Sequence, residues 1–227
     1  MAYLIVIEGT DGCGKQTQAN LLYEKLVRNG YNVLRQSFPN YDCDGCVPVK
    51  MYLGGEFGDN ANCMDAYQAS VLFTIDRLTT YKKYLEDFCK TDGILLLDRY
   101  MQSNMLHQAG KLDDWDKVDK YVDWLIDLEC NKLGLPKANK VIFLDVPPAV
   151  SRELIKSRGI HKSDTKKDVQ EDDEKHLYNA YHAGKYVSAI CNWDTIECTT
   201  DGQLKSIEDI ADMIWQSVEP DLNRLKK

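Results

Sequence analysis

The sequence predicts an α/β fold, a doubly wound parallel five-stranded sheet flanked by helices. Short apolar runs alternate with longer amphipathic stretches along the chain, which is the pattern of repeated strand–helix–strand units. A glycine-rich turn after the first apolar run leads into a helical pattern. With 227 residues, 44% of them hydrophobic, the chain is long enough to bury a sizeable core. We therefore expect a single domain over residues 1–227.

Five short apolar runs, rich in aliphatic residues, are predicted to form the strands. They occupy residues 3–8, 32–36, 93–97, 140–145 and 194–198. The run at 93–97 is the clearest, because it holds four consecutive aliphatic side chains, as a strand buried on both faces requires.

Helices are predicted between the strands, wherever apolar residues recur at helical spacing. They cover residues 17–28, 65–89, 114–133, 148–157, 168–191 and 206–222. The last begins with Ser206 as its N-cap and has Asp209 three residues later, the arrangement of a capping box. No internal repeat or polar linker divides the chain.

Composition excludes several classes of function. The formal charge of −8 argues against binding a nucleic acid polymer, which requires a basic surface. No apolar run approaches the roughly 20 residues of a membrane span, and the first run lacks a basic leader, so we expect a cytoplasmic protein. The eight cysteines are irregularly spaced and are interpreted as reduced thiols. Cys43 and Cys46 lack the second pair that a zinc site needs.

Residues 9–15, Gly-Thr-Asp-Gly-Cys-Gly-Lys, follow a predicted strand and open a helix, which is the context of a Walker A phosphate loop. Glycines let backbone N–H groups surround an anion, and the helix adds its positive end. Lys15 supplies a mobile charge for the β- and γ-phosphates. The sequence therefore predicts a P-loop nucleotide site made of Gly9, Thr10, Asp11, Gly12, Cys13, Gly14, Lys15, Gln16 and Thr17.

Gln16 stands where a Walker A loop usually has the hydroxyl that helps to hold Mg²⁺. Thr17 lies about 100° further round the helix and cannot simply replace it, so we expect carboxylates, water and ATP to hold the metal. Asp98 ends a buried strand, as a Walker B carboxylate does. We interpret Cys13 as a small loop filler whose thiol pKa the backbone dipoles should lower.

Arg99 follows Asp98 at a strand end, which in an open α/β sheet faces the ligand crevice. Its guanidinium could bridge two phosphates. Residues 152–167 hold six basic and two acidic side chains and are followed by an acidic run. This composition suits either a solvated loop or a lid over phosphates, at about 152–172.

These motifs together resemble bacterial thymidylate kinase, of the P-loop nucleoside monophosphate kinase family. The shared segments are residues 7–18, Phe38-Pro39, Leu72-Phe73-x-x-Asp76-Arg77, Asp98-Arg99-Tyr100-x-x-Ser103-Asn104 and Gly134-Leu135-Pro136-Lys137. They occur in the order and spacing of that family, from about residue 3 to the final helix. The resemblance implies in-line phosphorylation of dTMP to dTDP by MgATP, for dTTP biosynthesis, and a homodimer.

The resemblance also implies a role for individual residues. Phe73 would stack on thymine, Arg77 would donate to its 4-carbonyl oxygen, and Asn104, with Ser103, would read the other edge. The remaining assignments are Asp11 near the sugar 3′-hydroxyl and the metal, Phe38 and Tyr41 near the acceptor phosphate, His107 and Gln108 beside the sugar, Glu171 with Asp98 toward Mg²⁺, and Arg152 and Arg158 as lid cations acting with Lys15 and Arg99.

Two alternatives stay open. A deoxynucleoside kinase must deprotonate a sugar hydroxyl and favours a carboxylate after the second strand, but residues 35–40 contain none. A catalytically silent nucleotide-binding regulator is suggested by Gln16 and by His107, where many relatives have tyrosine. A preference for dTMP over dUMP depends on one methyl group, worth about 1–3 kcal/mol, and leaves no recognisable motif in the sequence. The role of residues 42–58 is also open.

Overall fold

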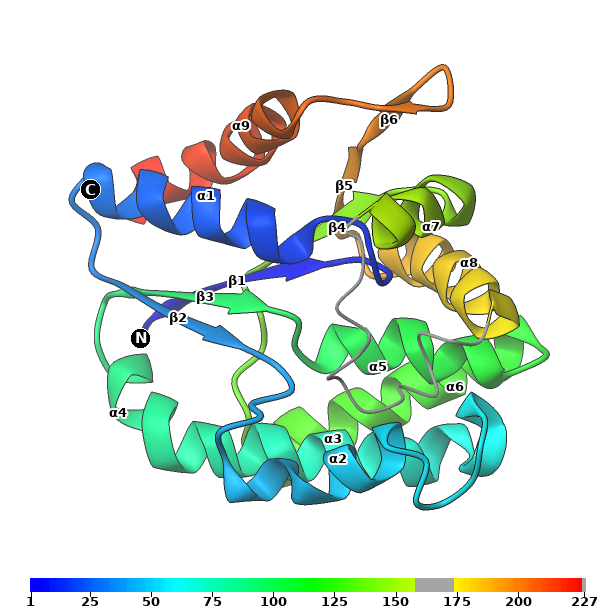
Figure 1. Ribbon diagram of the computed structural model, residues 1–227. Coiled ribbons are helices and arrows are strands. Elements are labelled where there is room, and N and C mark those ends of the chain that lie inside the picture. Colours follow the sequence, from blue (N-terminus) through cyan, green and yellow to red (C-terminus); the bar gives the residue numbers. More distant parts are fainter. Residues whose placement is uncertain (158–173, 226–227) are drawn as a thin grey trace.

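Five parallel strands form the central sheet of the computed structural model, which describes residues 1–157 and 174–225 (Figure 1). The strand order is β2-β3-β1-β4-β5. The bounds are Tyr3–Glu8 for β1, Val33–Ser37 for β2, Ile94–Asp98 for β3, Lys140–Asp145 for β4 and Asp194–Glu197 for β5. The prediction of a five-stranded parallel sheet flanked by helices is confirmed.

Helices cover both faces of the sheet (Figure 1). On one face α1, Lys15–Arg28, and α9, Ile207–Leu225, pack against alternate strand residues such as Ile5 and Ile7. On the other face the neighbouring residues Leu4 and Val6 belong to a second core. Its helices are α5, Met101–His107, α6, Trp115–Ile126, and α8, Glu174–Ile190. Because side chains alternate across a strand, the sheet is buried on both sides.

The described part of the chain contains four further α-helices. They are α2, Val47–Leu53, α3, Ala66–Thr80, α4, Glu86–Cys89, and α7, Pro148–Ser157. A π-helical segment, Tyr81–Leu85, joins α3 to α4, and a second one, Asp127–Lys132, follows α6. Two short strands, Thr199–Thr200 and Gln203–Leu204, form a hairpin before α9.

Most predicted helices are present, with shifted ends. The run at 65–89 is one helical path through α3, the π segment and α4, and Asp65 caps it reciprocally with Gln68. Ser206 caps the last helix as predicted, since Asp209 N donates to Ser206 Oγ over 3.0 Å, while the Ser206 hydroxyl donates to Asp209 Oδ2 over 2.7 Å. The helix predicted at 168–191 is described only over Glu174–Ile190.

Helices α2 and α5, each seven residues long, were not predicted from the sequence. Neither is long enough to show a helical period clearly. The first accounts for part of the segment left open at 42–58. It forms a small satellite core with α3 through Val49, Tyr52 and Ala69.

The described part of the chain contains no helix that is both long and apolar enough to cross a membrane. All eight cysteines are free thiols. Within residues 1–157 and 174–225, no cluster of three histidine, cysteine or acidic side chains could hold a metal ion on its own.

Candidate active site

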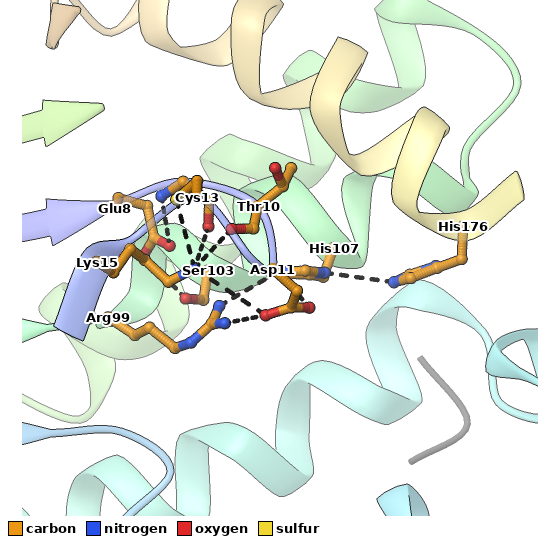
Figure 2. A network of polar contacts seen from close by, with 10 residues as sticks. Glu8, Thr10, Asp11, Cys13, Lys15, Arg99, Ser103, His107 and His176 are labelled. Atoms are coloured by element: carbon orange, nitrogen blue, oxygen red, sulfur yellow. Dashed lines mark hydrogen bonds and ion pairs between the residues drawn. The ribbon is translucent and has the colours of Figure 1, made fainter. Parts of the chain in front are cut away.

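The P-loop connects β1 to α1 at the carboxyl edge of the sheet (Figure 2). The Lys15 ammonium donates to the carbonyl oxygens of Gly9 and Thr10, both over 2.8 Å. Gly12 and Gly14 have φ of 79° and 92°, in the left-handed region that favours glycine. A side chain at Gly12 would also lie 2.7 Å from the Ser151 carbonyl oxygen, so the loop is packed tightly against α7.

The predicted phosphate-site residues divide by position. A groove at the loop is lined by Asp11, Gly12, Gly14, Lys15 and Gln16. Gly9, Thr10 and Cys13 are buried outside this lining, and Thr17 is exposed on α1 outside the groove. The Thr10 hydroxyl is buried and has no hydrogen-bond partner among the described residues.

The expected pKa of Cys13 is wrong. Burial raises the pKa of this thiol, even though Lys15 lies 3.8 Å from the sulfur and favours the thiolate. The loss of hydration outweighs the loop dipoles because the side chain is only 4% exposed. Cys13 is therefore an inert filler in this loop.

Arg99 projects from the end of β3 toward the P-loop and forms an ion pair with Asp11 (Figure 2). Its φ of 67° is unusual for a residue other than glycine. Burial alone would raise the pKa of Asp11, but Arg99 and Lys15 hold it well below its usual range. The Asp11 carboxylate is thus a permanent charge that holds Arg99 beside Lys15.

A second cavity begins at the same ion pair. It is lined by every residue that the resemblance assigned to the acceptor, namely Asp11, Phe38, Tyr41, Phe73, Arg77, Arg99, Ser103, Asn104, His107 and Gln108. Pro39, Leu53 and Tyr100 complete the wall and were not predicted. The side-chain amide oxygen of Gln108, Oε1, is buried without a partner among the described residues, which leaves it available to a donor on a ligand.

Two residues of the cavity wall, Phe73 and Arg77, lie on α3. Phe73 is half-buried and packs edge-on against Tyr52 of α2, with ring centroids 6.2 Å apart. Arg77 lies one turn further along and is held by Glu129, to which its Nε donates over 2.8 Å. Asp76 accepts from Asn40 N over 3.0 Å and so ties the loop after β2 to α3.

The P-loop groove and the second cavity share one wall, and we refer to them together as the two grooves. Asp11, Phe38, Pro39, Tyr41 and Arg99 line both of them. A ligand in the cavity and a phosphate chain on the P-loop would therefore meet at Arg99. Asp98 lies in the P-loop groove and is 6% exposed.

Two functional candidates, Arg158 and Glu171, fall outside the described residues, as does most of the predicted lid. Arg152 is described and forms an ion pair with Glu174 at the start of α8. This pair joins α7 to α8 on the two sides of the predicted lid.

Several side chains that shape the site were not predicted from the sequence. Glu8 is fully buried beneath the loop, where it accepts from Gly9 N over 3.1 Å and from Ser103 Oγ over 2.8 Å. Glu8 could have been predicted as a site residue, because it is an acidic residue at the end of an apolar strand. Glu129 and His176 had no such signal, because each is far in sequence from the residue it contacts.

The P-loop groove and the cavity that contains Phe73 are both lined by Arg99. This arrangement is suited to the transfer of a phosphoryl group between two small molecules. The fold and site thus define a P-loop kinase. The family model described as thymidylate kinase matches residues 7–192, and the chain belongs to that family.

Individual relatives agree with this assignment. A probable thymidylate kinase of Thermococcus onnurineus is 34% identical over 158 residues, which are 69% of this chain and 72% of that protein. A thymidylate kinase of Mycobacterium tuberculosis (strain CDC 1551 / Oshkosh) is 33% identical over 159 residues, 69% of this chain and 71% of that protein.

Proposed function

We propose that this protein transfers the γ-phosphoryl group of ATP to dTMP and releases dTDP. The observation that carries the proposal is that the cavity holding Phe73 and Arg77 opens on the Arg99–Asp11 pair beside Lys15. A thymine ring stacked on Phe73 would direct its phosphate toward Arg99, and ATP would occupy the P-loop groove. Family membership supports the same acceptor.

Charge neutralisation and alignment are the proposed sources of catalysis. The acceptor phosphate oxygen is already anionic, so no general base is required. On phosphate binding, Lys15 would exchange its contacts with the Gly9 and Thr10 carbonyls for phosphate oxygens. Arg99 would contact both phosphates and stabilise the charge on the transferred group. Arg158 in the predicted lid is proposed as a further cation.

The P-loop groove is compatible with Mg²⁺. This ion is usually held by one or two carboxylates together with substrate phosphates and waters. Asp98 supplies a carboxylate in the groove, to which no described residue donates a hydrogen bond, whereas Asp11 is already paired with Arg99. Bound Mg²⁺ would neutralise charge on the β- and γ-phosphates. We propose Asp98 as its principal ligand, with Asp11 and Glu171 as lesser contributors.

Base and sugar recognition are proposed for the remaining wall residues. Arg77 would donate to the thymine 4-carbonyl oxygen, and Asn104 would contact the opposite edge. Ser103 already donates its hydroxyl proton to Glu8, so toward a ligand it can act only as an acceptor. His107 and Gln108 would lie near the sugar. We also propose a single kinase domain with its lid at about 152–172, in a cytoplasmic protein.

A homodimer is proposed through α3. Tyr67, Val71 and Ile75 recur every four residues on this helix and are 39%, 41% and 38% exposed. A row of large apolar side chains on one helix face is typical of a contact surface. Sedimentation equilibrium should give a dimer for the wild type and a monomer for Val71→Asp, and a monomeric wild type would contradict the proposal.

An acceptor screen with MgATP tests the proposed activity. ADP formation is measured with dTMP, dUMP, dCMP and thymidine, and the Lys15→Ala variant serves as the blank. We expect turnover with dTMP and none with thymidine. Turnover confined to thymidine would instead establish a deoxynucleoside kinase. Tight binding of both ATP and dTMP in calorimetry without turnover would establish a silent regulator.

Metal use is tested separately. Asp98→Asn keeps the shape of the side chain but removes its charge. We expect this variant to need a higher Mg²⁺ concentration for half-maximal activity, while dTMP binding in calorimetry without metal stays unchanged. An unaltered Mg²⁺ requirement would remove Asp98 as the principal ligand.

A further inference from the structure

A chain of three side chains leads from the junction of the two grooves to α8 (Figure 2). Arg99 Nη1 lies 3.3 Å from His107 Nε2, and His107 Nδ1 lies 3.3 Å from His176 Nε2. The two imidazole rings are stacked, with centroids 5.5 Å apart and an interplanar angle of 22°. Both are buried, at 5% exposure each. The contact between the two histidines is thus shielded from competing water.

Hydrogen-bond chemistry gives this chain one direction. A guanidinium can only donate, so His107 Nε2 must accept from Arg99. The ring proton of neutral His107 is then on Nδ1, which donates to His176 Nε2. The contact with Arg99 therefore sets the tautomer of His107, and that tautomer makes His176 Nε2 an acceptor.

The surroundings of His107 keep it neutral. Charged or titratable groups face it from four places: Asp11 in the P-loop, Lys15 in α1, Arg99 after β3 and His176 in α8. Burial, aided by Arg99, His176 and Lys15 and opposed by Asp11, lowers the pKa of His107 to about 3. The geometry agrees with an acceptor at Nε2, because Arg99 Nη1 lies 3.3 Å from this nitrogen, whereas Asp11 Oδ2 lies 3.9 Å away, beyond hydrogen-bond distance.

His176 lies on α8, a helix that is tightly packed against its neighbours. A side chain added at Gly110 would lie 2.8 Å from Ala180 N, and one at Gly184 would lie 2.9 Å from Leu106 Cγ. Contacts this close leave no space between α8 and the segment containing α5. The end of the hydrogen-bonded chain is therefore held by the packed core of the protein.

We propose that His107 and His176 are positioning residues that hold the Arg99 guanidinium at the junction of the two grooves. Asp11 and His107 are the side chains that contact Arg99 in the described part of the chain. When phosphates draw the guanidinium away from Asp11, the contact with His107 limits how far it moves. This role rests on the proposed phosphoryl transfer, in which Arg99 contacts both phosphates.

The first test uses the wild-type protein and needs no activity. In ¹⁵N spectra of the imidazole groups near pH 7, His107 should show a protonated Nδ1 and an unprotonated Nε2. The opposite tautomer, or a charged ring, would overturn the proposal directly. Because this measurement is made without nucleotide, it remains decisive even if dTMP is not the acceptor.

The second test separates hydrogen bonding from packing. His176→Leu removes the acceptor, whereas His176→Gln can place an amide oxygen near the position of Nε2. We expect kcat to fall roughly three- to tenfold in the leucine variant, the loss typical of one hydrogen bond, with the KM for ATP unchanged. The glutamine variant should recover most of this loss and keep the proton of His107 on Nδ1.

His182→Leu is the matched control, since His182 lies on the exposed side of α8 and contacts only neighbouring rings in the described structure. It should behave as the wild type. The proposal is wrong if His176→Leu retains full kcat, or if His176→Gln is as impaired as the leucine variant, because packing would then explain the effect.

Discussion

Arg77 and Glu129 form an ion pair that is closed to solvent, with side chains 2% and 0% exposed. Thr74 adds a hydrogen bond of 2.8 Å to the same carboxylate. Glu129 lies in the π-helical segment after α6, and such insertions frequently occur at functional sites. The pair holds the guanidinium at the cavity wall. The donor proposed to read the base is therefore fixed before a ligand arrives.

Replacing Arg77 should affect dTMP far more than ATP. Loss of a charged donor to the base costs roughly 1.5–3 kcal/mol, so the KM for dTMP should rise at least about tenfold in Arg77→Ala, while the KM for ATP stays nearly constant. Steady-state kinetics with each substrate varied in turn measure the difference. An equal rise in both constants would argue against a base-reading role.

The same substitution should also destabilise the protein, because it leaves Glu129 buried and unpaired. Breaking a buried pair typically costs about 3–5 kcal/mol. Kinetics are therefore measured well below the melting temperature of the variant. Glu129→Gln is the companion variant: it keeps the Arg77 guanidinium and Thr74 contact but not the carboxylate, and it should lose less stability than Arg77→Ala.

Lys15→Ala should lower kcat by roughly 100- to 1000-fold, the loss seen when one preorganised charge-stabilising donor is removed. The fold should persist, because Lys15 contacts only the loop residues around it. Thermal unfolding and turnover are measured on the same sample. Lys25→Ala, on the same helix but outside the P-loop groove, is the control, and near-normal turnover of Lys15→Ala would exclude the loop from the mechanism.

Cys13 should resist alkylation. Burial raises its pKa, and the thiolate is the reactive form. Peptide mapping after timed treatment with iodoacetamide at pH 8 should find Cys63, which is only partly buried, labelled well before Cys13. Labelling of Cys13 at a rate equal to that of Cys63 would show that the loop dipoles outweigh burial after all.

Lys111 should make stability depend on pH under alkaline conditions. Its side chain is partly buried in the turn after α5, where the ammonium donates to Tyr52 Oη and to the Met64 carbonyl oxygen, both over 3.0 Å. Burial lowers its pKa to about 8. Between pH 8 and the ordinary lysine value the unfolded chain binds a proton that the native state does not, so stability rises with pH through this window.

Urea unfolding of the wild type and Lys111→Met isolates that contribution. The free-energy difference between them should move in favour of the wild type by up to about 3 kcal/mol from pH 8 to 10.5. Lys117→Met, an exposed substitution, should show no such trend. A constant difference for Lys111→Met would mean that the native amine keeps its ordinary pKa.

Local sequence patterns were enough to predict the fold class and the P-loop part of the site. The apolar runs specify strands and the glycines of the P-loop specify a turn, because both depend on residues adjacent in sequence. Asp98 and Arg99 followed from their place at a strand end. The acceptor residues came from the resemblance to a family, and their gathering around one cavity is a property of the folded chain.

The sequence by itself determined the parallel sheet, the phosphate loop and the order of the motifs, since periodicity and turn chemistry act over a few residues. Only the tertiary structure decided the pairing of Arg77 with Glu129, 52 positions away, and of His107 with His176, 69 positions away. It also reversed the expected pKa shift of Cys13. Burial and ion pairing depend on which distant segments exclude water from a group, and chain packing sets that exclusion.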